Sequence, residues 1–283
     1  MASDFAPVPL APGVSVGPGR PLAFIAGPCV IESPEHALRV AAILKEIAAE
    51  LSIPIVFKAS FDKANRSSLN AYRGPGLEAG LAVLAEIRRV TGMPLLTDVH
   101  EPDQATAAAE VVDVLQVPAF LCRQTDLLLA CGRTGKPVNV KKGQFMAPHD
   151  MSNVVAKVSS TGNRAVTLTE RGSSFGYNNL VVDLRSLAIM RRLAPVVFDV
   201  THALQLPGGL GHATGGAKEF HLHLARGAVA AGVDAIFAEV HDDPPNALSD
   251  APTQLSPEEF RTLVKQALVI RHAVEQLGVE ERG

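Results

Sequence analysis

The 283-residue sequence contains no tryptophan, only two tyrosines and only three cysteines. So few aromatic rings offer little surface on which bases could stack, and a net charge of -3 provides no general excess of cations for a phosphate backbone. Nucleic acid is therefore not an expected partner. The odd number of cysteines, without framework spacing, argues against a disulfide scaffold and predicts free thiols in a reducing cytoplasm.

Long apolar runs are also missing. No uncharged apolar stretch approaches the roughly 18 residues that would indicate a membrane span. The first residues have no basic segment before an apolar run, so we expect neither a membrane segment nor a signal peptide. The hydrophobic residues, 47% of the chain, lie instead in short runs that are sufficient for one large core.

These short runs alternate with amphipathic segments. The runs predict eight strands, at Leu22–Ala26, Pro54–Lys58, Pro94–Asp98, Val112–Gln116, Pro137–Lys141, Ala165–Thr169, Val196–Val200 and Ala235–Val240. Helices are predicted at Pro34–Leu51, Leu77–Val90, Gln104–Val111, Thr125–Cys131, Leu184–Leu193, Gly215–Ala231 and Ser256–Leu277. Ser33 and Pro34 are placed to start the first helix, and Ser256 with Glu259 forms a capping-box signature at the last.

Eight alternations in a chain of this length predict a single (β/α)₈ barrel over residues 22–277. Residues 1–21, rich in proline, glycine and valine, are expected to form a short hairpin or plug that closes the barrel bottom. A doubly wound open sheet is the rival architecture, but no glycine fingerprint follows the first strand.

Polar residues stand at the carboxyl ends of the predicted strands, where barrel enzymes carry their chemistry. Many are separated by two positions, as in Lys58/Ser60 and Asn139/Lys141, which places both on one side of a strand. Five cations gather in these regions: Lys58, Lys63, Arg66, Lys141 and Arg171. Cations buried at a barrel mouth need anions, so this set predicts a ligand with more than one phosphate or carboxylate. The alternative is that they are solvated loop residues.

A second set mixes a thiol, an imidazole and two carboxylates: Cys29, His202, Glu239 and Asp250. These ligands suit a borderline divalent metal such as zinc, iron or manganese, although no spacing motif joins them. Cys29 alone could equally be a small buried apolar residue. The histidines of "FHLHLA", His221 and His223, are spaced as ordinary helix residues.

Two further features leave alternatives open. The segment Gln205–Gly216 contains five glycines directly after the seventh strand and is either a lid over the site or merely a long loop. Cys122 and Cys131 are expected to pack in the core or in helices.

Several stretches together resemble one known family, the 3-deoxy-D-manno-octulosonate 8-phosphate synthases, from about Leu22 to Leu277. They are "FKASFDKANRSS", "YRGPGLEAGL", "TDVHEP", "VLQVPAFLCRQTDLL", "NVKKGQF", "RGSSFGYNNLVVD", "FDVTHALQLPGG" and "ALSDAPTQL". The resemblance implies a (β/α)₈ barrel, usually a homotetramer, that condenses phosphoenolpyruvate with D-arabinose 5-phosphate and water. The products are the eight-carbon sugar acid phosphate and inorganic phosphate, on the route to the Kdo of lipopolysaccharide.

The resemblance also implies roles for particular residues. Lys58, Ser60, Lys141 and Arg171 would hold the phosphate of phosphoenolpyruvate, and Lys63 with Gln116 would face its carboxylate. Asn65, Arg66 and Ser67 would bind arabinose 5-phosphate, with Arg66 and Ser67 reaching a neighbouring subunit's site. Cys29 matches the metal-dependent branch of the family, whose other ligands match His202, Glu239 and Asp250. The catalytic residues would be Lys63, Lys141, His202 and Asp250, and His202 would also contact substrate.

Two other functions remain in view. The related 3-deoxy-D-arabino-heptulosonate 7-phosphate synthases take erythrose 4-phosphate and typically show "KPRTS" where this chain reads "KANRSS". A non-catalytic barrel that binds phosphorylated metabolites would need the cations but no metal ligands.

Overall fold

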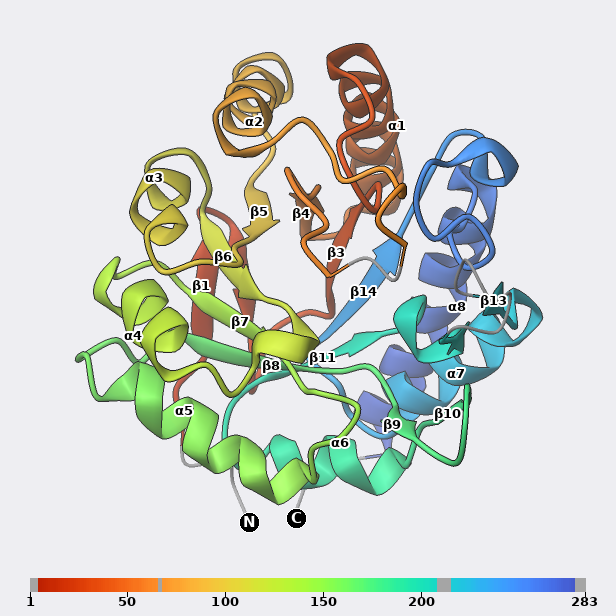
Figure 1. Ribbon diagram of the computed structural model, residues 1–283. Helices are drawn as coiled ribbons and strands as arrows, with labels where there is room; N and C mark the ends of the chain where they lie inside the picture. The colour runs from red at the N-terminus through yellow and green to blue at the C-terminus, as the bar shows by residue number, and fades with distance from the viewer. Residues whose placement is uncertain (1–4, 66–67, 208–214, 278–283) are drawn as a thin grey trace.

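The computed structural model describes residues 5–65, 68–207 and 215–277. Eight parallel strands close into a barrel in the order β11-β14-β3-β4-β5-β6-β7-β8, and helices surround it (Figure 1). The strands are β3 (Ala23–Gly27), β4 (Ile55–Lys58), β5 (Leu95–Asp98), β6 (Val114–Val117), β7 (Val138–Lys141), β8 (Val166–Glu170), β11 (Val196–Asp199) and β14 (Ala235–Glu239). The predicted (β/α)₈ barrel is confirmed.

In the described part of the chain, eight α-helices pack outside these strands. They are α1 (Pro34–Leu51), α2 (Leu77–Thr91), α3 (Gln104–Val111), α4 (Thr125–Arg133), α5 (Met151–Ser159), α6 (Leu184–Met190), α7 (His221–Ala230) and α8 (Pro257–Gln276). Ser33 caps α1 by accepting from the backbone N–H of His36, and the capping box of Ser256 and Glu259 opens α8, both as predicted. Short 3₁₀ turns are η1 (Ala119–Leu121), η2 (Pro148–Asp150), η3 (His202–Leu204), η4 (Lys218–Phe220) and η5 (Pro244–Asn246).

Two parts of the helix prediction differ from the structure. Helix α5 was not predicted. The predicted helix Gly215–Ala231 begins too early, because Gly215–Gly216 is the extended strand β13, paired with β12 (Gln205–Leu206), and α7 starts only at His221. Two consecutive glycines are poor helix formers. A β-carbon on Gly216 would also lie 2.3 Å from the Thr253 side chain, so only glycine fits this pairing.

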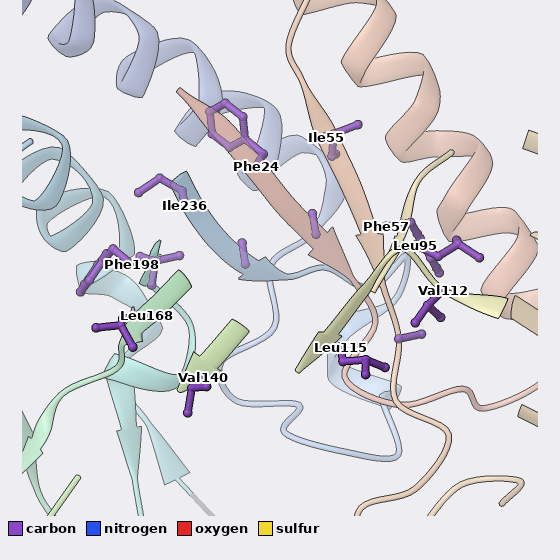
Figure 2. Packing of buried hydrophobic residues seen from close by; sticks show 14 of the residues in the cluster. Phe24, Ile55, Phe57, Leu95, Val112, Leu115, Val140, Leu168, Phe198 and Ile236 are labelled. Atoms are coloured by element: carbon purple, nitrogen blue, oxygen red, sulfur yellow. The ribbon is translucent and has the colours of Figure 1, made fainter. Parts of the chain in front are cut away.

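The core has two layers. Strand residues that face outward pack against the helices, and Figure 2 shows Phe24, Ile55, Phe198 and Ile236 among them. Residues that face inward at the amino ends of the strands, including Ile25 of β3, form a separate cluster. Both faces of each strand are therefore buried, which explains why the strands read as continuous apolar runs.

The amino-terminal hairpin closes the inner layer at the bottom of the barrel. Strands β1 (Val8–Ala11) and β2 (Val14–Val16) pair in antiparallel fashion. Four hairpin side chains are buried in the inner cluster: Val8, Leu10, Val14 and Val16. The prediction of a hairpin at the barrel bottom is confirmed. Water is thus excluded from this end, and polar chemistry is confined to the other.

Two short hairpin pairings lie beyond the barrel strands. Strands β9 (Ser173–Ser174) and β10 (Leu180–Val181) follow β8, and β12 with β13 follows β11. The β12–β13 pair joins the two ends of the predicted lid, whose residues 208–214 lie outside the described residues. No helix among the residues described is long and apolar enough to cross a membrane.

Candidate active site

The inner face of the barrel changes from apolar to polar along each strand. On β4 the inward position Val56 is followed by Lys58, and on β11 Val197 is followed by Asp199. Every second residue of a strand faces the same side, and the next positions in the two sequences, just after the strands, are Ser60 and Thr201. The polar ends of all strands therefore meet at the barrel mouth opposite the hairpin.

A cavity opens at this mouth and is lined by most of the predicted substrate-binding residues. Among its lining residues are Lys58, Lys63, Asn65, Gln116, Lys141, Arg171, His202 and Asp250. Ser60 does not line the cavity; its hydroxyl is buried and donates to Asp98. Arg66 and Ser67 lie outside the described residues. The structure thus brings four of the five predicted cations together, Lys58, Lys63, Lys141 and Arg171, against the alternative that these four are separate solvated loop residues.

Arg171 carries an unused donor at this cavity. Its Nη2 donates to the Oε1 of Gln205 at 2.9 Å, but its Nη1 is buried and has no hydrogen-bond partner among the described residues. Burial lowers the pKa of Arg171, with nearby carboxylates acting in the opposite direction. A buried unpaired guanidinium N–H is costly, so this donor is suited to an acceptor beyond the part of the chain that the structure describes.

Lys58 and Lys63 enter the floor of the cavity from the β4 end and the loop after it. Lys58 Nζ donates to the backbone oxygen of Cys29 at 2.9 Å and lies 3.6 Å from Oε1 of Glu239. Burial lowers the pKa of Lys58, and the neighbouring Lys63 acts in the same direction. Burial also opposes the charge of Lys63, but the acidic groups around it raise its pKa overall; these groups are Cys29, Asp98, Glu239 and Asp250.

Three of the four predicted metal ligands form one compact group. The Cys29 Sγ and carboxylate oxygens of Glu239 and Asp250 all lie within 4.8 Å of one another. Cys29 lies two residues after the end of β3, Glu239 is the last residue of the adjacent β14, and Asp250 lies in the loop after β14. His202 belongs beside this group, with Nε2 3.6 Å from Glu239 Oε1 and 3.8 Å from Asp250 Oδ2.

The group suits a cation for a specific reason. Both carboxylate oxygens of Glu239 are buried and, within residues 5–65, 68–207 and 215–277, have no hydrogen-bond partner; the Nζ atoms of Lys58 and Lys63 lie 3.6 and 4.0 Å from its Oε1. A buried carboxylate without hydrogen bonds is costly unless a cation is bound to it. Burial raises the pKa of the Cys29 thiol, and Asp250 adds to this, so a metal would have to displace a proton to bind the sulfur.

The sequence reasoning missed Asp199 as a member of the site. Its Oδ2 lies 2.6 Å from Lys141 Nζ and 2.7 Å from His202 Nδ1. Burial alone would raise the pKa of Asp199, but His202 and Lys141 hold it well below its usual range. Asp199 therefore fixes His202 with Nε2 directed at the carboxylates, which is the usual arrangement behind a metal-binding imidazole. Its position at a strand end was the available signal.

Other contacts around the site were also missed. Ser249 Oγ lies 2.7 Å from Cys29 Sγ, and Gln254 accepts from the Cys29 N–H while donating to the Ser249 carbonyl oxygen at 2.7 Å. Asp98 lies beside Lys58 and accepts from Ser60. Ser249 and Gln254 belong to the same loop as Asp250, but only the structure shows that both contact Cys29.

A cation-lined cavity at the carboxyl ends of the strands places this protein among the (β/α)₈-barrel enzymes that act on anionic substrates. The model of the DAHP synthetase I family matches residues 6–275. A 2-dehydro-3-deoxyphosphooctonate aldolase from Syntrophotalea carbinolica is 59% identical over 258 residues, covering 91% of this chain and 93% of that protein. Proteins of the same name from Desulfatibacillum aliphaticivorans and Koribacter versatilis are each 58% identical, covering 92% of this chain and 96% and 95% of theirs.

The chain therefore belongs to the DAHP synthetase I family and, within it, to the 2-dehydro-3-deoxyphosphooctonate aldolases. That name is an alternative for the octulosonate 8-phosphate synthases that the sequence motifs resemble.

Proposed function

We propose that this enzyme condenses phosphoenolpyruvate with D-arabinose 5-phosphate and water to give 3-deoxy-D-manno-octulosonate 8-phosphate and inorganic phosphate, in Kdo and lipopolysaccharide biosynthesis. The relatives are named for an eight-carbon acid, and the three carbons of phosphoenolpyruvate leave five for the sugar. This favours arabinose 5-phosphate over the four-carbon substrate of the heptulosonate synthases. The observation that carries the proposal is the unpartnered Nη1 of Arg171 on a cavity shared with Lys58, Lys63 and Lys141.

In this proposal the cations divide between the anionic groups. Lys58, Lys141 and Arg171, with Ser60 behind them, hold the phosphate of phosphoenolpyruvate. Lys63 and Gln116 face its carboxylate; the Oε1 of Gln116 is buried and accepts no hydrogen bond from the residues that the structure describes. Asn65, Arg66 and Ser67 bind arabinose 5-phosphate, the last two in a neighbouring subunit of a homotetramer. The free cysteines support a cytoplasmic location.

The reaction follows from these positions. C3 of phosphoenolpyruvate forms a bond to the aldehyde carbon, the aldehyde oxygen takes a proton, and the oxygen of water bonds to C2. The C2–O bond to phosphate then breaks, and the second proton of water leaves with phosphate. Lys141, held by Asp199 at 2.6 Å, would stabilise negative charge on the departing phosphate.

Cys29, His202, Glu239 and Asp250 would hold a divalent metal, with zinc, iron and manganese as the candidates. When bound, such an ion would polarise the aldehyde or lower the pKa of the water. The support is the orphaned carboxylate of Glu239 and the orientation of His202 by Asp199.

The function is tested by measuring phosphate release from phosphoenolpyruvate with aldose phosphates of five and four carbons. We expect turnover with arabinose 5-phosphate and a product whose mass corresponds to eight carbons. When the oxygen that bridges C2 and phosphorus in phosphoenolpyruvate carries an isotope label, the label should be recovered in inorganic phosphate. Preference for erythrose 4-phosphate would support the heptulosonate synthase instead. Binding of both ligands without phosphate release would support a non-catalytic barrel.

The metal assignment predicts the behaviour of Cys29 variants. Chelation should abolish activity while the barrel stays folded, and an added divalent metal should restore it. Cys29→Ala should lose both metal and activity. Cys29→Asn, which copies the metal-independent branch of the family, should keep measurable activity that no longer responds to chelator. Metal analysis decides the assignment: equal metal content in wild type and Cys29→Ala would overturn it, and Cys131→Ala, which removes a buried thiol in α4, is the control.

A further inference from the structure

The loop that follows β14 carries Asp250, so its placement decides whether the metal ligands can meet. The base of the loop is fixed, because Leu255 N donates to the Glu239 oxygen and His241 N donates to the Leu255 oxygen, each at 2.9 Å. Asp250 stands five residues before Leu255 and has a φ of 50°, in the left-handed region. Apart from glycine, Asp and Asn are the residues that adopt this conformation most readily, and its cost is met when the surrounding contacts hold the backbone there.

Glu32, in the connection between β3 and α1, holds the outer part of this loop. Its Oε1 accepts from the Leu248 N–H at 2.8 Å and lies 3.2 Å from the Nε2 of His241. A single carboxylate oxygen thus joins the start of the loop to the residues just before Asp250. The Tyr72 hydroxyl donates to the backbone oxygens of Ile31 and Glu32, so Glu32 is itself anchored.

Glu32, His36 and His241 also have the composition of a metal site, with ligand atoms within 4.8 Å of one another. The hydrogen bonds indicate a different function. The Asp243 N–H donates to Nδ1 of His241 at 2.9 Å, so the proton of the neutral imidazole must be on Nε2, facing Glu32. An Nε2 that carries a proton has no lone pair for a metal. His241 is therefore a donor to Glu32 in this cluster.

We propose that Glu32 is a positioning residue that presets the Asp250 loop for cation binding. The proposal rests on the metal assignment of Cys29, Glu239 and Asp250 and deepens it. Glu32 follows Cys29 by three residues, so one segment supplies a ligand and also fixes the loop that supplies another. Partners that orient metal ligands typically contribute 10- to 100-fold to metal affinity.

The test compares three variants in competition with a chromophoric chelator for cobalt(II) and zinc. Glu32→Ala should weaken metal affinity about 10- to 100-fold. Glu32→Gln keeps an amide oxygen in the place of Oε1 and should bind within a few-fold of wild type. Glu35→Ala removes an exposed carboxylate from the first turn of α1, three residues after Glu32, and should bind as wild type does. Amide hydrogen exchange of residues 241–250 without metal should accelerate in Glu32→Ala only.

The outcomes separate the two proposals. Wild-type affinity and unchanged exchange in Glu32→Ala would overturn the positioning role. Equal losses in Glu32→Ala and Glu32→Gln would also overturn it, because charge rather than the acceptor would then matter. Two bound ions in wild type and one in Glu32→Ala would make Glu32 a ligand. If wild type binds no metal, the metal assignment fails, and hydrogen exchange still decides whether Glu32 holds the loop.

Discussion

At the scale of single residues, Asp199 links the two halves of the site. One carboxylate oxygen contacts Lys141, which faces the substrate cavity, and His202, which faces the candidate metal ligands. The other oxygen accepts from the backbone N–H and the hydroxyl of Thr201 and from the N–H of His202. Both carboxylate oxygens of Asp199 therefore have polar partners, and a shift of this side chain would displace Lys141 and His202.

Asp199→Asn should impair metal binding and catalysis together. The amide has a similar shape but no charge, so it no longer favours the Nδ1–H form of His202 and no longer balances Lys141. We expect metal affinity to fall about 10- to 100-fold, measured by chelator competition. Asp183→Asn, at an exposed carboxylate paired with Arg185, is the control. Unchanged metal affinity in Asp199→Asn would show that His202 is held by other contacts or is not a ligand.

At the scale of elements, the approach of β3 to β4 positions both Cys29 and Lys58. Gly27 ends β3, and a β-carbon built on it would lie 2.0 Å from the carbonyl oxygen of Lys58. This distance is far inside van der Waals contact, and the obstacle is backbone, which cannot rotate away. Glycine at this position lets the two strands approach closely enough for Lys58 Nζ to reach the Cys29 oxygen.

Gly27→Ala should therefore separate the ends of these strands. We expect a loss of about 1–3 kcal/mol in the free energy of unfolding, as for other overpacked sites, together with weaker metal binding. Urea denaturation measures the first and chelator competition the second. Gly227→Ala in α7 is the matched control: its β-carbon would lie 3.4 Å from Leu184, and alanine favours helix. Equal stability of wild type and Gly27→Ala would show that the strands tolerate separation.

At the scale of the whole molecule, polarity is sorted along the barrel axis. The hairpin end is apolar, and the opposite end concentrates buried ions. Asp98 is one of these: burial alone would raise its pKa, but Lys63 and Lys58 hold it well below the usual value of 3.8. Asp199 is held low in the same way. Such carboxylates stay ionised in the native state under conditions in which the unfolded chain is protonated.

The protein should accordingly lose stability in acid. A carboxylate with a depressed native pKa stabilises the fold above its unfolded pKa, and this contribution disappears as pH falls below about 4 toward the native value. We expect the free energy of unfolding, from urea titrations, to decline between about pH 5 and pH 3, and less steeply in Asp199→Asn. A flat profile over this range would show that these carboxylates have ordinary pKa values.

The barrel architecture follows from the sequence alone. Strand and helix periods are local, so eight alternations, the helix caps and the polar residues at strand ends could all be read from it. The spacing of Lys58 and Ser60 or of Asn139 and Lys141 already indicated a shared face. The local period failed at Gly215–Gly216, where pairing with Gln205–Leu206 imposes extended backbone.

Which of these residues come into contact depends on the folded barrel. Cys29 and Asp250 are 221 positions apart, and they come together because the barrel closes, with β14 pairing with β3. The contacts of Asp199, Glu32 and Gln254 likewise depend on elements that are distant in the chain. Local periodicity does not indicate such contacts, because strand order and register determine which side chains meet across a closed barrel.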